Sequence, residues 1–228
     1  MYLIQLAVDQ EKSEHNIVKD GLRDEQQHQH APDNDHMKVE SDDFHLHYWH
    51  DPIVKRIEKR LARLTMFPDD YGEQSVITKF TAGQEETIDA DGVDETLYEY
   101  KNGTTAYDAI ARKGQHVATV IIYLNDVEEG GHIVFPYAGR SEKEARKLKE
   151  REDFMSSHTH RKVCSMWNVM YVSPKRGDAI FFYDLDTDNT YSTATNYANC
   201  PVRKGSKWIL KKRINITSES TAYFFYII

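Results

Sequence analysis

Short runs of β-branched and aromatic residues recur along the chain from residue 75 onwards. Each run is bounded by Gly, Asn, Asp or Pro, as the strands of globular proteins are. Several short strands separated by irregular loops are typical of a β-sandwich or a barrel. We therefore predict a mainly β fold with flanking helices and with strands at 75–80, 116–124, 133–135, 179–183 and 208–210.

A helix is predicted before the first of these strands. Asp51 provides a side-chain acceptor at the N-cap, and Pro52 suits the first helical position. Apolar residues then follow at spacings of four, four and three, which places them on one face of a helix that packs on a core. These residues are Ile53, Ile57, Leu61 and Leu64, and the segment 68–72 ends the helix.

The other long segments are strongly polar. Residues 1–50 are rich in Asp, Glu, Gln, His and Lys, and we expect them to form a partly disordered leader. Residues 51–217 form the predicted domain, and 218–228 form a tail. Within the domain, 141–153 has almost no apolar face, so we expect a charged helix in solvent, as part of an insertion at about 139–172.

Composition and charge exclude some partners. The chain has 228 residues and a formal net charge of -8, which opposes nucleic-acid binding because phosphates attract clustered Lys and Arg. No apolar run approaches the ~20 residues that span a bilayer. The start of the chain has no basic segment before its apolar residues and does not resemble a signal peptide. With only Cys164 and Cys200, a single disulfide and free buried thiols are both open.

Three segments are similar to the catalytic domain of prolyl 4-hydroxylases. The segment 114–136 resembles a strand–turn–strand unit of that family almost residue for residue. The segment 174–182 resembles the turn and strand before the family's last metal ligand, and 200–208 resembles its closing strand. The predicted helix at 51–64 matches the helix before the family's barrel. Because the segments follow the family's order and spacing, chance is a poor explanation.

The resemblance implies a double-stranded β-helix, or jelly-roll, with an active site in its open mouth. In that family a His-x-Asp pair and a distal histidine hold iron(II), which leaves positions open for 2-oxoglutarate and oxygen. The resemblance also implies ascorbate as a cofactor and proline-rich or collagen-like peptides as substrates. Animal relatives work in the lumen of the endoplasmic reticulum, so we expect that compartment here.

Two of the three iron-ligand positions do not hold histidine. The His-x-Asp pair aligns with Asp89 and Asp91, and the distal histidine aligns with Tyr197. The lysine that pairs with the far carboxylate of 2-oxoglutarate is kept as Lys207. Oxygen donors suit magnesium or calcium better than iron(II), and a phenol with a pKa of about 10 must lose its proton to ligate well. We therefore expect strongly reduced hydroxylase activity, with Asp91 as the catalytic ligand if activity persists.

Simpler roles are open for the same residues. If no metal binds, Asp89 and Asp91 are ordinary loop residues and Tyr197 is a packed aromatic. Lys207 is then a strand lysine whose head reaches solvent. His132 follows two glycines and would fill a vacant ligand position if its side chain turned inwards, which strand alternation alone does not decide.

Three functions fit this pattern. A pseudoenzyme would keep a groove for polyproline II peptides without a metal. An active oxygenase would use an atypical metal site, and a non-catalytic subunit would assemble with an active relative. The family's leading strand and helix are not recognisable before Asp51, so we expect both to be missing.

Overall fold

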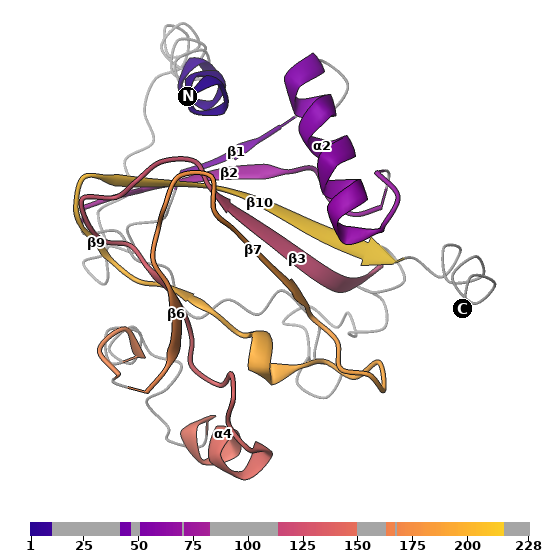
Figure 1. Ribbon diagram of the computed structural model, residues 1–228, viewed down its shortest axis with the longest axis vertical. Coiled ribbons are helices and arrows are strands. Elements are labelled where there is room, and N and C mark those ends of the chain that lie inside the picture. Colours follow the sequence, from indigo (N-terminus) through magenta and orange to yellow (C-terminus); the bar gives the residue numbers. More distant parts are fainter. Residues whose placement is uncertain are drawn as a thin grey trace, which may run out of the picture.

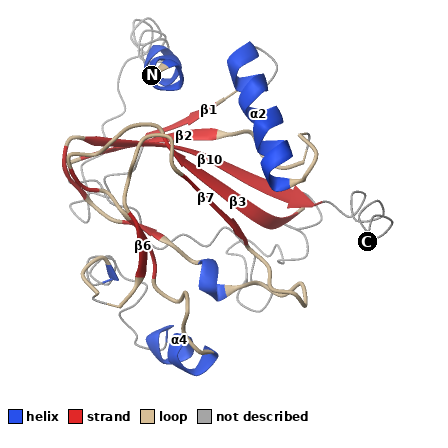
Figure 2. Ribbon diagram, viewed as in Figure 1, coloured by secondary structure: helices blue, strands red, loops and turns tan. Residues whose placement is uncertain are grey.

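The computed structural model describes residues 1–10, 42–46, 51–69, 71–82, 114–149, 163–166 and 168–216. Strands dominate these segments and helices are few, as predicted (Figure 2). Asp89, Asp91 and the expected tail at 218–228 lie outside the described residues. Among the described segments, none of the helices has the length and hydrophobicity needed to cross a lipid bilayer.

A five-stranded antiparallel sheet forms the larger wall of the fold (Figure 1), with its strands in the order β1-β2-β10-β3-β7. The strands are β1 (Asp42–His45), β2 (Val76–Thr81), β10 (Ser206–Ile216), β3 (Gln115–Tyr123) and β7 (Ala179–Tyr183). Neighbouring strands such as β2 and β10 are far apart in the sequence. The chain therefore crosses between layers instead of forming a simple meander.

The opposite wall is made of shorter strands. A three-stranded sheet has the order β6 (Met170–Val172), β5 (Ile133–Phe135) and β8 (Ala198–Asn199). β4 (Glu129–Gly130) pairs with β9 (Val202–Lys204), and a short 3-10 helix, η1 (Thr193–Thr195), precedes β8. Buried side chains from both walls form one cluster, namely Phe80, Ile121, Tyr123, Ile133, Phe135, Tyr197, Val202 and Ile209. The space between the walls is the interior of the fold.

The central strand β10 has two distinct faces. Side chains alternate along a strand, and Ile209 belongs to the interior cluster whereas Leu210 belongs to a second cluster on the outer face. Lys207 and Lys211 therefore share the interior face with Ile209. One strand thus supplies both the interior and the outer core.

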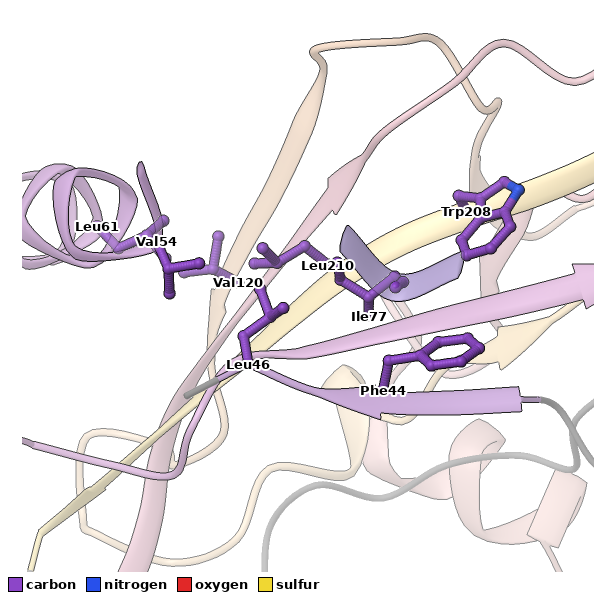
Figure 3. Close-up of a cluster of buried hydrophobic side chains, with 9 residues drawn as sticks. Phe44, Leu46, Val54, Leu61, Ile77, Val120, Trp208 and Leu210 are labelled. Carbon is purple, nitrogen blue, oxygen red and sulfur yellow. The ribbon is translucent and has the colours of Figure 1, made fainter. Parts of the chain in front are cut away.

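Helix α2 (Pro52–Thr65) and the helix over residues 2–10 cover the outer face of the large sheet (Figure 1). The N-cap prediction is confirmed, because the Asp51 side chain accepts hydrogen bonds from the Ile53 and Val54 amides at 2.7 and 3.1 Å. Figure 3 shows Val54 and Leu61 pointing from α2 towards the sheet. The predicted apolar stripe was partly wrong, since Leu64 is 57% exposed.

The buried side chain of Glu58 explains why the face of α2 that packs on the sheet is rotated away from the predicted apolar stripe. Its carboxylate is buried and lies 3.0 Å from the Lys212 ammonium on β10. Ser75 donates a second hydrogen bond to Glu58 at 2.6 Å. The helix therefore directs Val54, Glu58 and Leu61 to the sheet, because an ion pair replaces part of the apolar contact that the sequence pattern suggested.

Part of the predicted polar leader is ordered structure. Residues 2–10 are helical, and Ala7 is buried in the outer cluster. β1 pairs with β2, and its Phe44 ring stacks on Trp208 with centroids 6.1 Å apart. A helix and a strand thus precede Asp51 in the described part of the chain. The strand signal was masked because Phe44 and Leu46 alternate with Asp and His residues.

The predicted charged helix is present as α4 (Glu142–Lys149), but it does not lie free in solvent. Ala145 and Leu148 pack on a buried cluster that contains Val163 and Cys200. A disulfide joins Cys164 to Cys200, which settles the open choice between a bridge and free thiols. Helix α4 therefore packs on the outer face of the small sheet.

Candidate functional site

Tyr197 and Lys207 are the two predicted site residues that the structure describes, and both point into the interior. Tyr197 precedes β8 and Lys207 lies near the start of β10, so the two walls of the fold each provide one. Both side chains are 0% exposed. Both predicted positions are thus buried between the two walls, while Asp89 and Asp91 fall outside the described residues.

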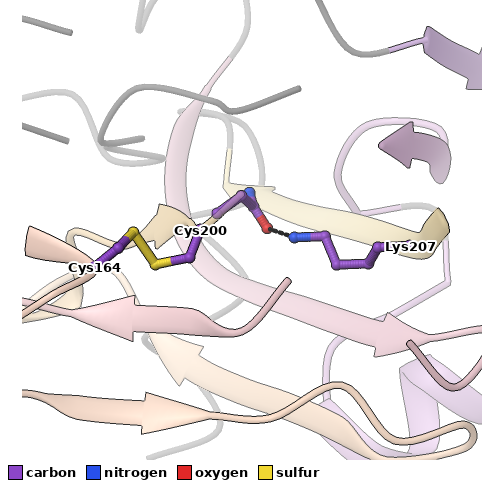
Figure 4. Close-up of a disulfide and its surroundings, with 4 residues drawn as sticks. Cys164, Cys200 and Lys207 are labelled. Carbon is purple, nitrogen blue, oxygen red and sulfur yellow. Dashed lines mark hydrogen bonds between the residues drawn. A yellow bond between two sulfur atoms is a disulfide. The ribbon is translucent and has the colours of Figure 1, made fainter. Parts of the chain in front are cut away.

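Two neutral groups contact Lys207. Its Nζ donates to Asn199 Oδ1 at 2.7 Å (Figure 4). It also lies 4.1 Å from the centroid of the Phe80 ring. An amide acceptor and an aromatic face both stabilise a charged ammonium. The simpler reading of Lys207 as a lysine that reaches solvent is therefore wrong.

Two glycines shape the space beside Lys207. Gly130 and Gly131 have positive φ values of 79° and 72°, which favour glycine. A Cβ on Gly130 would lie 2.5 Å from the Pro201 carbonyl oxygen, so glycine is needed where β4 meets β9. A Cβ on Gly131 would lie 3.5 Å from Lys207 Cδ, which places this glycine against the lysine stem.

Tyr197 is enclosed by aromatic rings. The ring centroids of Phe135 and Phe182 lie 6.0 and 5.8 Å from that of Tyr197, in tilted and edge-to-face arrangements. The Tyr197 hydroxyl accepts a hydrogen bond from Lys211 Nζ at 3.2 Å. This environment fits the simpler expectation that Tyr197 is a packed aromatic. Lys211 adds a hydrogen bond to it.

Lys211 is a site residue that the sequence reasoning missed. It is 8% exposed and lies on the interior face of β10, where its Cα partner in β3 is Ile121. The signal was available, because residues four apart on a strand share a face. Since Lys207 was expected to face the interior, Lys211 could have been expected to face it too.

His132 does not fill a vacant ligand position. Ile133 and its partner Asn199 face the interior, so the preceding His132 lies on the other side. Its ring makes an edge contact with Tyr171, with centroids 5.8 Å apart. Burial lowers the pKa of His132, the Cys164 carbonyl opposes that shift, and the positive charges of Lys207 and Arg203 add to it.

Tyr197, the residue predicted at the distal ligand position, is a poor match for iron(II). Its phenol oxygen accepts a hydrogen bond from an ammonium group, and a nearby positive charge opposes a metal cation. Within the described part of the chain, no three His, Cys, Asp or Glu side chains are grouped to hold a metal. Phenol and ammonium together are instead suited to hydrogen-bonding an anion.

Tyr123 is a further polar group in this region. Tyr123 lies on the interior face of β3, and its hydroxyl donates to the Val172 carbonyl at 3.1 Å. Burial raises the pKa of Tyr123 well above that of an ordinary phenol, so the proton stays on the ring oxygen. The described interior thus contains the buried Tyr123 hydroxyl as well as Tyr197 and the two lysines.

The chain is similar to plant prolyl 4-hydroxylases. Over 167 residues it is 34% identical to probable prolyl 4-hydroxylase 3 of Arabidopsis thaliana, covering 73% of this chain and 50% of the relative. Prolyl 4-hydroxylase 2 of the same plant is 32% identical over 168 residues, again with 50% of the relative covered. The chain therefore spans about half the length of these relatives. No protein-family model matches it.

A solved structure shares the fold. The viral collagen prolyl hydroxylase of Paramecium Bursaria Chlorella virus-1, solved with 2-oxoglutarate (2OG), matches with a TM-score of 0.51 at 22% identity. The match covers 78% of this chain and 80% of that one. The fold is thus the double-stranded β-helix of dioxygenases, as predicted. Together with the plant relatives, it shows that this chain carries a prolyl 4-hydroxylase-like dioxygenase domain.

Proposed function

We propose that this chain is a prolyl 4-hydroxylase homologue with little or no hydroxylase activity that keeps a site for proline-rich or collagen-like peptides. The observation that carries the proposal is Tyr197, a buried phenol bound by Lys211 at the position where relatives would place a histidine ligand. Even changes next to metal ligands typically cost ~10–100-fold in affinity or activity. Replacing ligands themselves costs more.

Exposed aromatic side chains support the peptide part of the proposal. Tyr171 on β6 is 64% exposed and contacts His132. Tyr183, at the end of β7, is also exposed. Aromatic rings on a surface are the groups that bind polyproline II chains, and this recognition needs no metal.

Turnover of 2-oxoglutarate tests the loss of activity. With iron(II), ascorbate and a proline-rich peptide, we expect no succinate above background, while the peptide still binds in calorimetry. Succinate release at the rate of an active hydroxylase would overturn the proposal. The double variant Asp89→His with Tyr197→His restores the family's ligand types, and a gain of turnover would show that the scaffold is otherwise competent.

A matched control keeps that gain interpretable. Asp89→His with Tyr171→His introduces the same two residue types, but the second lies on the exposed face of β6. We expect this control to stay inactive. Equal turnover in both double variants would point to a histidine effect unrelated to the distal ligand position.

An active oxygenase with an atypical metal site is the second candidate. Lys207 favours it, because a buried lysine at the cosubstrate position is kept in place by Asn199 and Phe80. This candidate requires one iron(II) per chain, with ascorbate keeping the metal reduced, and loss of turnover in Asp91→Ala. If calorimetry shows no iron binding at micromolar metal, this second candidate is ruled out.

We also propose an oxidising compartment, with the lumen of the endoplasmic reticulum as the specific expectation. The Cys164–Cys200 disulfide supports it, because such bonds persist where thiols are not kept reduced. Alkylation of the protein as isolated from its own cells should leave both cysteines unmodified. Full alkylation without a reductant would contradict an oxidising location.

A further inference from the structure

The exposed side of helix α2 carries a concentration of positive charge. With about 3.6 residues per turn, the helix directs Val54, Glu58 and Leu61 to the sheet and leaves an arc of side chains on the opposite side. All the basic residues of the helix are exposed and lie on this arc, namely Lys55, Arg56, Lys59, Arg60 and Arg63. These five residues are called the basic face below.

No carboxylate neutralises the basic face within the described part of the chain. Glu58 is the one acidic residue of α2, and it is buried on the opposite side in its pair with Lys212. None of the five cations takes part in an ion pair among the described residues. Like charges on neighbouring helical turns repel one another. This repulsion is retained in a chain whose formal net charge is -8, so the positive charge is gathered on one helix.

Large apolar and aromatic side chains border the basic face at both ends of α2. Leu64 is 57% exposed, and Met66, which caps the helix, is 84% exposed. Met66 has a φ of 62°, in the left-handed region that favours glycine. An exposed methionine there adds nothing to the core and strains the backbone, and such outliers are found at functional surfaces. At the other end, the half-exposed Tyr2 donates a hydrogen bond to Asp51, the N-cap residue.

We propose that helix α2 attaches the protein to a membrane surface that contains anionic phospholipids. Lysine and arginine side chains bind lipid phosphates and carboxylates through their charged heads, while their alkyl stems lie along apolar surface. Leu64 and Met66 enter the boundary between headgroups and acyl chains. A basic helix bordered by apolar residues is typical of this kind of peripheral attachment.

The shape of this surface favours a membrane over an acidic protein. Helix α2 is the outer layer over the large sheet (Figure 1), so its exposed side is a convex ridge. A flat bilayer meets such a ridge along its whole length, which is ~21 Å for 14 residues. The exposed Leu64 and Met66 have no role in binding a purely charged partner.

The negative charge of the chain as a whole does not prevent this contact. Interactions between exposed charges are largely screened beyond ~8 Å at physiological ionic strength. The small sheet lies roughly 20 Å from the basic face, because a helix and the large sheet lie between them. The lipid surface therefore meets mainly the local positive charge. Tyr171 on β6 belongs to the opposite wall and stays turned to solvent in the attached protein.

Sedimentation with lipid vesicles gives the first test. The wild-type chain is mixed with vesicles of phosphatidylcholine and phosphatidylserine in equal amounts, or of phosphatidylcholine alone, with EDTA present to exclude bridging by calcium. We expect much tighter binding to the anionic vesicles. This binding should fall steeply as sodium chloride is raised to about 1 M, where the screening length is ~3 Å. Equal sedimentation with both kinds of vesicle, or none with either, would overturn the proposal.

Charge variants of α2 give the second test. Arg56→Gln, Lys59→Gln and Arg63→Gln together remove the centre of the basic face. Glutamine is a good helix former and all three positions are exposed, so the fold is kept. Each cation near an anionic bilayer contributes a factor of about five to binding, and we therefore expect a loss of ~100-fold.

A matched control removes the same number of exposed cations elsewhere. Lys175→Gln, Arg176→Gln and Lys204→Gln change the loop before β7 and the strand β9, and they lower the net charge by the same amount. We expect vesicle binding close to that of the wild type. Equal losses in the two triple variants, both folded by circular dichroism, would assign the binding to net charge and overturn the role of α2.

An apolar variant separates a membrane from an acidic protein. Leu64→Gln with Met66→Gly leaves every cation in place, and glycine suits the positive φ of position 66. We expect binding to anionic vesicles to fall ~10-fold, because two apolar side chains no longer leave water. Unchanged binding, or binding of the wild type to a polyglutamate peptide as tight as to the anionic vesicles, would assign the basic face to an acidic partner instead.

Attachment through α2 is independent of the proposed loss of hydroxylase activity. Among the described residues, no predicted site residue lies on this helix, and Tyr197 and Lys207 face the interior. Succinate release by the wild-type chain would overturn the proposed function and leave the vesicle results unaffected.

Discussion

Tyr197 gives a direct prediction at the scale of single residues. In Tyr197→Phe the ring still packs with Phe135 and Phe182, but Lys211 Nζ loses a buried hydrogen-bond acceptor. Loss of one partner of a buried charged group costs about 1–3 kcal/mol. We expect urea unfolding to show a loss of this size. The same change at the exposed Tyr171 should be nearly neutral, and equal effects would argue against the Tyr197–Lys211 contact.

His132 gives a pH dependence. Burial lowers the pKa of His132 below its usual 6.5, so the folded chain favours the neutral ring. A lowered folded-state pKa contributes stability above the unfolded pKa, and this contribution is lost as the pH falls through the folded value. Wild-type protein should therefore lose free energy of unfolding between pH 7.5 and pH 5.

The variant His132→Gln isolates that contribution, because glutamine does not titrate. Its stability should change less over the same interval, as measured by denaturant unfolding at each pH. His45→Gln serves as the control, since His45 is exposed on β1. A pH dependence that is unchanged in His132→Gln would assign the loss to other groups.

The sequence was enough to predict the place of some single residues but not of others. The resemblance to prolyl 4-hydroxylases, counted from Cys200, predicted site positions at Tyr197 and Lys207, and both side chains are buried. It did not decide the face of His132, which depends on where β5 begins, nor the contact between Lys211 and Tyr197, which depends on how two distant strands pair. Contacts between the two walls depend on the tertiary structure, and a local sequence pattern does not predict them.

Among the elements, helix α2 depends on a buried ion pair. In Glu58→Ala the Lys212 ammonium, 8% exposed at its side chain, remains buried without its carboxylate partner. Breaking a buried pair in this way typically costs about 3–5 kcal/mol. We expect a loss of this order in thermal or urea unfolding. Lys59→Ala, on the exposed side of the same helix, should change stability by less than ~0.5 kcal/mol.

The elements that the sequence predicted share one property. β2, β3, β5, β7, α2 and α4 each have a clear local pattern, and all were expected near their observed positions. β4 and β8 have only two residues each, which is too short for any periodicity to show, and β6 and β9 were not predicted. β1 was hidden by its charged neighbours, although Phe44 contributes an aromatic contact with Trp208.

At the scale of the whole molecule, the disulfide joins the segment after α4 to the end of β8 (Figure 4). A cross-link between residues 36 apart restricts the unfolded chain by about 3–4 kcal/mol. Cys164→Ser with Cys200→Ser should lower the free energy of unfolding by roughly that amount. Dithiothreitol should lower the melting temperature of the wild type and leave the double variant unaffected. A reductant effect in the double variant would point to another cause.

The jelly-roll architecture was predictable because it needed only the order of strands and the resemblance of three segments. The described structure extends that prediction by showing how the two walls meet at Lys207, Asn199 and Tyr197. The order and spacing of motifs thus defined the fold, whereas the chemistry of the interior required the pairing of strands.

Strand β10 buries Lys207, Lys211 and Lys212, whereas Lys204, just before it, is exposed. Brief treatment with acetic anhydride should therefore acetylate Lys204 at once. The three buried lysine amines should react only when the sheet opens locally. Mass spectrometry of their acetylation rates would report the local opening of the central strand, with the protein's own amines as the probe.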